Sequence, residues 1–139
     1  MQVAHSERHR SKQRILIVDD DPDIVGTLKD RLKADGFEVA TAPNGRDALA
    51  QVWGWKPDAI LLDLQMPIMN GLEALRAIRL ARDPVPVLVM TAVDHGLRAL
   101  ALSAGATGCL LKPFDYAAVK AKLEALLQGR SGRRRGHEA

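Results

Sequence analysis

Four apolar segments of the chain each end on a polar side chain of a kind that takes part in chemistry. Carboxylate oxygens are the ligands that a hard divalent cation such as Mg²⁺ prefers. A hydroxyl can donate a hydrogen bond to a phosphoryl oxygen, and an ammonium group can neutralise the charge on such oxygens. The residues at the four ends are three consecutive aspartates, a further aspartate, a threonine and a lysine: Asp19, Asp20, Asp21, Asp63, Thr91 and Lys112. If they lie together, they form a site for a cation and a phosphoryl group.

The segments that lead to these residues have the pattern of buried parallel strands. They are short and apolar, and helix-like stretches separate them. Ligands bind open parallel sheets at the carboxyl ends of the strands, so neighbouring strands would bring the polar residues into one crevice. Asp21 and Asp115 are predicted to cap the first and last helices. Five strands alternate with five helices in this prediction, with strands at 15–18, 37–41, 59–62, 87–90 and 107–111.

Length and composition predict one domain with basic tails. A chain of 139 residues is long enough for one core, and its single cysteine excludes an internal disulfide, which fits the cytoplasm. The polar start does not resemble a signal peptide, and no stretch is apolar enough to span a membrane. Residues 1–14 and 129–139 hold eight of the 20 basic residues and two of the 17 acidic ones, which leaves a net charge of −3 elsewhere. We therefore expect flexible tails at 1–13 and 129–139, and a core that does not bind nucleic acid directly.

The order and spacing of the polar residues resemble the receiver domain of two-component response regulators, over about residues 14–128. Each motif alone is weak, but together they lie on the expected strands. The motifs are Val18-Asp19-Asp20, the stretch from Asp63 to Gly71 (DLQMPIMNG), Thr91-Ala92 and Lys112-Pro113-Phe114. The resemblance implies a CheY-like, flavodoxin-like α/β fold, which is a three-layer sandwich with a parallel sheet in the order 2-1-3-4-5.

The resemblance also implies a function. Asp63 would accept a phosphoryl group from a partner histidine kinase, a phosphotransfer protein or a small phosphodonor, and form an aspartyl-phosphate. The domain would then change conformation and signal to an unknown downstream protein or output domain. It would catalyse only its own phosphorylation and dephosphorylation, and it would not be an enzyme in the usual sense.

Each residue of the predicted site has a role in this scheme. A metal ion, Mg²⁺ or Mn²⁺, would be held by carboxylates and by one backbone carbonyl, from Asp19, Asp20, Asp63 and Gln65. The phosphoryl oxygens would be stabilised by Thr91, Ala92 and Lys112. Grouping carboxylates at strand ends without a cation is costly, which favours a metal over a purely structural role. Helix capping explains Asp21 but not Asp63.

Four positions are expected to tune or transmit the phosphorylated state. Gln65 and Val93 correspond to the family's positions that affect autodephosphorylation, and the apolar Val93 predicts slow loss of the phosphoryl group. The resemblance implies a cis peptide bond between Lys112 and Pro113. Cys109 stands where receivers usually carry Tyr or Phe, so the usual movement of an aromatic ring is not expected here. We interpret Cys109 as a small buried apolar residue rather than a redox sensor.

Several alternatives remain open at the level of sequence. The main one is a pseudo-receiver, which would bind proteins without being phosphorylated, although such proteins tend to lose the acidic pair, the acceptor or the lysine. A small-molecule aspartyl-phosphate phosphatase would need an aspartate in place of Gln65. A flavin-binding module would need a Ser/Thr/Gly-rich loop in place of the three aspartates. The chain is either a stand-alone receiver or a piece of a longer regulator, and we expect a monomer or a weak dimer.

Overall fold

The computed structural model of the chain describes residues 12–66, 68–92 and 95–128. In these residues, strands and helices alternate as predicted. The strands are β1 (Arg14–Val18), β2 (Glu38–Ala42), β3 (Ala59–Asp63), β4 (Val87–Thr91) and β5 (Gly108–Leu111). The helices are α2 (Pro22–Ala34), α3 (Gly45–Trp55), α4 (Gly71–Leu80), α5 (His95–Ser103) and α6 (Tyr116–Gln128). The predicted tails lie outside the described residues except for Lys12 and Gln13.

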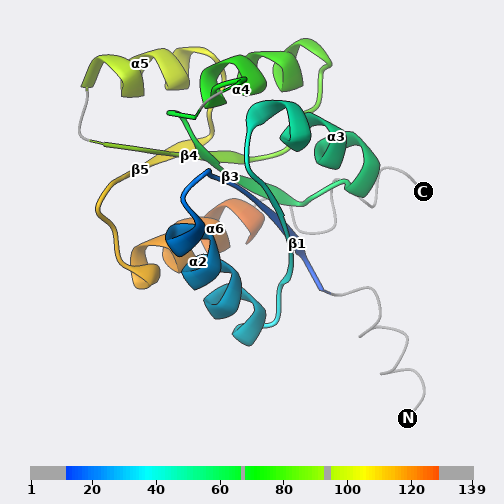
Figure 1. Cartoon of the computed structure of the whole chain (residues 1–139), viewed down its shortest axis with the longest axis vertical. Coiled ribbons are helices and arrows are strands. Elements are labelled where there is room, and N and C mark those ends of the chain that lie inside the picture. The colour runs from blue at the N-terminus through cyan, green and yellow to red at the C-terminus, as the bar shows by residue number, and fades with distance from the viewer. Residues whose placement is uncertain (1–11, 67, 93–94, 129–139) are drawn as a thin grey trace.

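The five strands form one parallel sheet in the order β2-β1-β3-β4-β5. Helices α3, α4 and α5 lie on one side of this sheet, and α2 and α6 lie on the other (Figure 1). This arrangement confirms the predicted flavodoxin-like, three-layer fold. Among the described helices, none is long and apolar enough to cross a membrane.

Two apolar clusters, one on each face of the sheet, hold the layers together. Alternate residues of a strand point to opposite faces, so Leu16 of β1 packs in the cluster that includes Val52 of α3 and Leu75 of α4. Its neighbour Ile17 packs in the cluster that includes Leu32 of α2 and Leu123 of α6. All five residues of β3 and of β4 are buried, as expected of central strands covered on both faces.

Side-chain caps determine where the helices begin, close to the site. Asp21 accepts a hydrogen bond from the backbone N–H of Asp23 at 2.9 Å, with Pro22 as the first residue of α2. Asp115 accepts one from the backbone N–H of Ala118 at 2.9 Å, at the start of α6. Both predicted caps are therefore confirmed.

One predicted strand is displaced by a residue. The sequence predicts a strand at 37–41, whereas β2 covers Glu38–Ala42. The reason is that the backbone N–H of Phe37 donates to the carbonyl of Leu32 at 3.1 Å, which makes Phe37 part of the turn after α2. Its half-buried ring packs against the α2 and α6 side of the core.

Candidate functional site

Three carboxylates gather at the carboxyl ends of β1 and β3. Asp19 and Asp63 are buried, and Asp20 is exposed. One oxygen of each lies within 4.8 Å of the others, close enough for all three to hold one metal ion. The register explains this grouping, because Val18 of β1 pairs with Leu62 of β3, so both strands end at the same level. The structure thus brings together the three aspartates that the sequence predicts as metal ligands.

Lys112 follows β5 and lies between the two buried carboxylates. Its Nζ atom is 3.4 Å from Oδ2 of Asp19 and 3.5 Å from Oδ1 of Asp63. Its backbone N–H donates to the carbonyl of Thr91 at 2.7 Å, which ties the end of β5 to the end of β4. The peptide bond between Lys112 and Pro113 is cis, as the resemblance implies. The ammonium group therefore faces the carboxylates rather than solvent alone.

The surroundings of Asp63 disfavour its charged form. Burial raises the pKa of Asp63 to about 6, and the nearby negative charge of Asp19 contributes in the same direction. The hydrogen bond from the backbone N–H of Gln65 to Oδ1 of Asp63, at 3.2 Å, and the ammonium group of Lys112 oppose this increase in the pKa. The site accordingly contains more negative charge than Lys112 neutralises, which is the electrostatic condition that a divalent cation corrects.

Thr91, the last residue of β4, completes the set of polar groups at the sheet edge. It follows Met90, which pairs with Asp63, and its side chain is fully buried. Among the described residues, its Oγ1 is the one buried side-chain nitrogen or oxygen atom without a hydrogen-bond partner. Buried polar groups normally have such partners, so an orphaned hydroxyl at this edge fits a ligand that accepts a hydrogen bond there.

We expect Thr91→Val to stabilise the free protein, by about 1 kcal/mol in the free energy of unfolding. Valine has nearly the shape of threonine, and the substitution removes a buried hydroxyl that has no partner. Urea unfolding of the metal-free protein measures this difference. The matched control is Thr107→Val, because Oγ1 of Thr107 accepts from the backbone N–H of Val87 at 3.0 Å. That substitution should destabilise the protein by about 1 kcal/mol, and the same sign for both variants would contradict our explanation.

The remaining residues of the predicted site differ in their exposure to solvent. Gln65, Ala92 and Pro113 are exposed, whereas Val93 lies outside the described residues, so its expected effect on dephosphorylation is not tested. Cys109 is only partly buried and packs against the α3, α4 and α5 side of the core. Burial raises the pKa of its thiol. The cysteine is therefore less enclosed than the sequence interpretation suggests.

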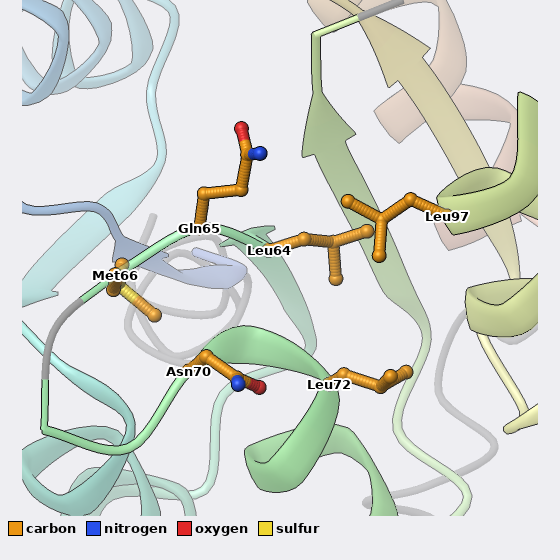
Figure 2. Close-up of a pocket in the computed structure, with 6 residues that line it drawn as sticks. All are labelled: Leu64, Gln65, Met66, Asn70, Leu72 and Leu97. Carbon is orange, nitrogen blue, oxygen red and sulfur yellow. The ribbon is translucent and has the colours of Figure 1, made fainter. Parts of the chain in front are cut away.

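A pocket lies beside the loop that follows Asp63. It is lined by Leu64, Gln65, Met66, Asn70, Leu72 and Leu97. In Figure 2, Leu64 points toward Leu97 of α5, while the amide of Gln65 extends away from both leucines. The loop thus presents an apolar side chain to α5 and a polar one in another direction.

Sequence reasoning missed two glycines that shape the site. A Cβ atom at Gly71, the first residue of α4, would overlap the carbonyl oxygen of Asp63. A Cβ atom at Gly45, the first residue of α3, would lie 2.6 Å from the carbonyl oxygen of Met69. Both follow an asparagine that caps the helix, and this local signal indicates a helix start without indicating which distant backbone lies against it.

Known proteins resemble this chain in sequence and in structure. The family model of the response regulator receiver domain matches residues 15–124 of this chain. The transcriptional regulatory protein PrrA of Mycobacterium tuberculosis is 43% identical over 129 residues, which cover 91% of this chain and 52% of that protein. The response regulator MprA of Mycolicibacterium vanbaalenii is 41% identical over 116 residues, which cover 83% of this chain and 50% of that protein. The chain thus spans about half the length of these curated relatives.

Solved structures agree with the sequence relatives. The receiver domain of the Francisella response regulator 1452 has a TM-score of 0.82 at 25% identity and covers 86% of this chain and 100% of its own. The response regulator TrrA of Thermotoga maritima, solved in complex with Mg²⁺-BeF, has a TM-score of 0.75 at 36% identity and covers 83% of this chain and 99% of its own. The chain belongs to the family of response regulator receiver domains of two-component systems.

Proposed function

We propose that the chain accepts a phosphoryl group on Asp63 in a Mg²⁺-dependent reaction and thereby switches its signalling state. The observation that carries this proposal is the unpartnered, buried hydroxyl of Thr91 at the sheet edge that also carries the carboxylate of Asp63 and the ammonium group of Lys112. A phosphoryl group on Asp63 would offer the acceptor oxygen that the hydroxyl lacks. TrrA, which shares the fold of this chain, was solved in complex with Mg²⁺-BeF.

Asp63, Lys112 and Thr91 act directly on the phosphoryl group in the proposed reaction. A carboxylate oxygen of Asp63 forms a bond to phosphorus, the bond from phosphorus to the donor breaks, and the donor leaves with the electron pair of that bond. Lys112, already 3.5 Å from Asp63, pairs with the phosphoryl oxygens, and the Thr91 hydroxyl donates to one of them. The exposed Ala92 next to it leaves room for the group.

The donor set at the site fits Mg²⁺, which prefers oxygen ligands and retains several waters. Asp19, Asp20 and Asp63 would hold the ion, with the backbone carbonyl of Gln65 as a further ligand. When bound, the ion neutralises charge on the phosphoryl oxygens. Asp19 also accepts a hydrogen bond from the backbone N–H of Asp21 at 2.9 Å, which fixes the orientation of its carboxylate.

The partners follow from the family. We propose that a histidine kinase or a phosphotransfer protein supplies the phosphoryl group, and that a downstream protein or an output domain responds to it. PrrA is named as a transcriptional regulatory protein, which supports an output in transcription. PrrA and MprA are both about twice as long as this chain. A pseudo-receiver is less favoured, because Asp63, the acidic residues beside it and Lys112 are all in place.

Acetyl phosphate tests the proposal directly. We expect the wild-type protein, incubated with Mg²⁺ and acetyl phosphate, to gain the mass of one phosphoryl group, measured by mass spectrometry of the intact protein. The gain should disappear in Asp63→Asn and in the presence of a chelator. The matched control is Asp47→Asn, which changes an exposed aspartate in the first turn of α3 and should leave the gain intact. A wild-type protein that gains no mass would favour the pseudo-receiver.

A further inference from the structure

The loop between β3 and α4, which the structure describes at 64–66 and 68–70, carries the backbone carbonyl of Gln65 that the proposed function assigns to the metal. Its first residue is held firmly, because the backbone N–H of Leu64 donates to the carbonyl of Met90 at 3.1 Å. The backbone N–H of Gly71 donates to the carbonyl of Leu64 at 3.3 Å and draws the two ends of the loop together. These two hydrogen bonds hold the two ends of the loop. The conformation of its second half, at 68–70, depends on other contacts.

The second half of the loop contains a backbone conformation that its residue, Ile68, disfavours. Ile68 has a φ angle of +68°, in the left-handed region, and its side chain is 70% exposed. A β-branched residue rarely adopts this conformation, which costs roughly 1–2 kcal/mol. An exposed side chain recovers little of this cost by packing. The conformation at Ile68 must therefore be imposed by contacts of the neighbouring residues.

Met69, the next residue, has such a contact with α3. The backbone N–H of Gly45 donates to the carbonyl of Met69 at 2.9 Å. This N–H belongs to the first turn of α3, where amide groups have no partner within the helix. A Cβ atom at Gly45 would lie 2.6 Å from the carbonyl oxygen and 2.7 Å from Cγ of Met69, so no larger residue fits without moving the loop.

We propose that Gly45 is a positioning residue for the metal site. Its backbone N–H donates to the carbonyl of Met69, and its lack of a side chain allows this close approach. Gly45 thereby holds the loop that carries Gln65 in the conformation that binds Mg²⁺. The contacts of Gly45 described above are with Met69, so its influence on the metal would pass through the loop. This inference rests on the proposed function, because it assumes that Mg²⁺ binds at Asp19, Asp20 and Asp63.

The test is a calorimetric titration of the full chain with Mg²⁺ alone. We expect Gly45→Ala to weaken Mg²⁺ binding about tenfold or more, the effect typical of residues that orient metal ligands from outside the coordination shell. Gly54→Ala is the matched control in the same helix, because a Cβ atom there meets nothing within 4 Å. Its Mg²⁺ affinity should remain within about twofold of the wild-type value, below the range for residues that orient ligands.

A second control separates positioning from loss of stability. Gly36 has a φ angle of +96° in the turn after α2, and a Cβ atom there meets nothing within 4 Å. Gly36→Ala should therefore lower the thermal midpoint through backbone strain and leave the Mg²⁺ affinity unchanged. If Gly36→Ala weakens Mg²⁺ binding as much as Gly45→Ala does, the effect is one of stability and the inference is wrong.

Hydrogen exchange in the wild-type protein tests the same inference even if Gly45→Ala does not fold. Saturation with Mg²⁺ should slow exchange at the amide of Gly45, which bonds to the loop, severalfold more than at the amide of Ala48, which bonds to Asn44 within the same region. Equal slowing at both amides would overturn the inference. Wild-type protein that binds no Mg²⁺, or Asp20→Asn protein that binds it equally well, would overturn the proposed function itself.

Discussion

Asp63→Asn should raise the free energy of unfolding of the metal-free protein by about 2–3 kcal/mol at pH 7.5. The reason is that the folded protein must keep this buried carboxyl ionised at neutral pH, next to Asp19. Ionising a carboxyl whose pKa lies at about 6 rather than 3.8 costs the folded state about 3 kcal/mol. An asparagine keeps an oxygen that can accept from the backbone N–H of Gln65 and removes the charge. Denaturant unfolding in the presence of a chelator measures the difference.

The pH dependence of this difference has a definite sign. The pKa of Asp63 is raised in the folded state, so the folded protein binds its proton more tightly than the unfolded chain does. The contribution of the Asp63 carboxyl to the free energy of unfolding of the wild type is fully present below about pH 3.8. It is lost as the pH rises through about 6. The advantage of Asp63→Asn should therefore be small near pH 4 and reach its full value above about pH 7.

Two measurements check this explanation. Asp20→Asn also removes one negative charge from the cluster, but from an exposed position, so its stabilising effect should be clearly smaller. Added Mg²⁺ should stabilise the wild-type protein, by about 2.7 kcal/mol at a concentration 100 times its Kd, and should stabilise Asp63→Asn much less. An advantage of Asp63→Asn that stays constant from pH 4 to 8 would show that charge is not its cause.

The fold and the polar side chains of the site can be predicted from the sequence for the same physical reason. Central strands of a parallel sheet are buried on both faces, so they read as uninterrupted apolar runs, and the residue that ends each run is the one at the ligand-binding edge. The apolar runs that lead to Asp63 and Thr91 therefore place both residues at this edge. Both are indeed the last residues of their strands, β3 and β4.

The interactions that connect these elements could not be predicted in the same way. The pKa of Asp63 depends on its burial beside Asp19, 44 positions earlier in the chain, and no local pattern reports that proximity. The contact of Gly45 with Met69 likewise joins segments that are remote in sequence. The one displaced strand has a local origin instead, because the backbone N–H of Phe37 bonds to the carbonyl of Leu32, five residues earlier, in the turn that follows α2. Tertiary contacts therefore decided the pKa of Asp63 and the contact of Gly45, whereas a local turn decided the start of β2.

Gly71→Ala should be among the most damaging single substitutions in the chain, with a loss of about 3 kcal/mol or more in the free energy of unfolding. A Cβ atom at this position would overlap the carbonyl oxygen of Asp63, and it would lie 2.8 Å from Cα of Leu64. Overpacking ordinarily costs about 1–3 kcal/mol because side chains can shift to relieve it. Here the obstructing atoms are backbone atoms of a central strand and its exit, which move only if the sheet edge or α4 moves.

The substitution should also affect phosphorylation, because the atoms that it displaces belong to the proposed phosphoacceptor. We expect Gly71→Ala protein that remains folded to be phosphorylated by acetyl phosphate more slowly than wild type at saturating Mg²⁺. Gly26→Ala is the control, since a Cβ atom at this position within α2 meets nothing within 4 Å. That variant should gain about 0.5–1 kcal/mol from the higher helix propensity of alanine and keep the wild-type phosphorylation rate. If Gly71→Ala loses less than about 1 kcal/mol, the backbone at Asp63 yields more easily than so close a contact implies.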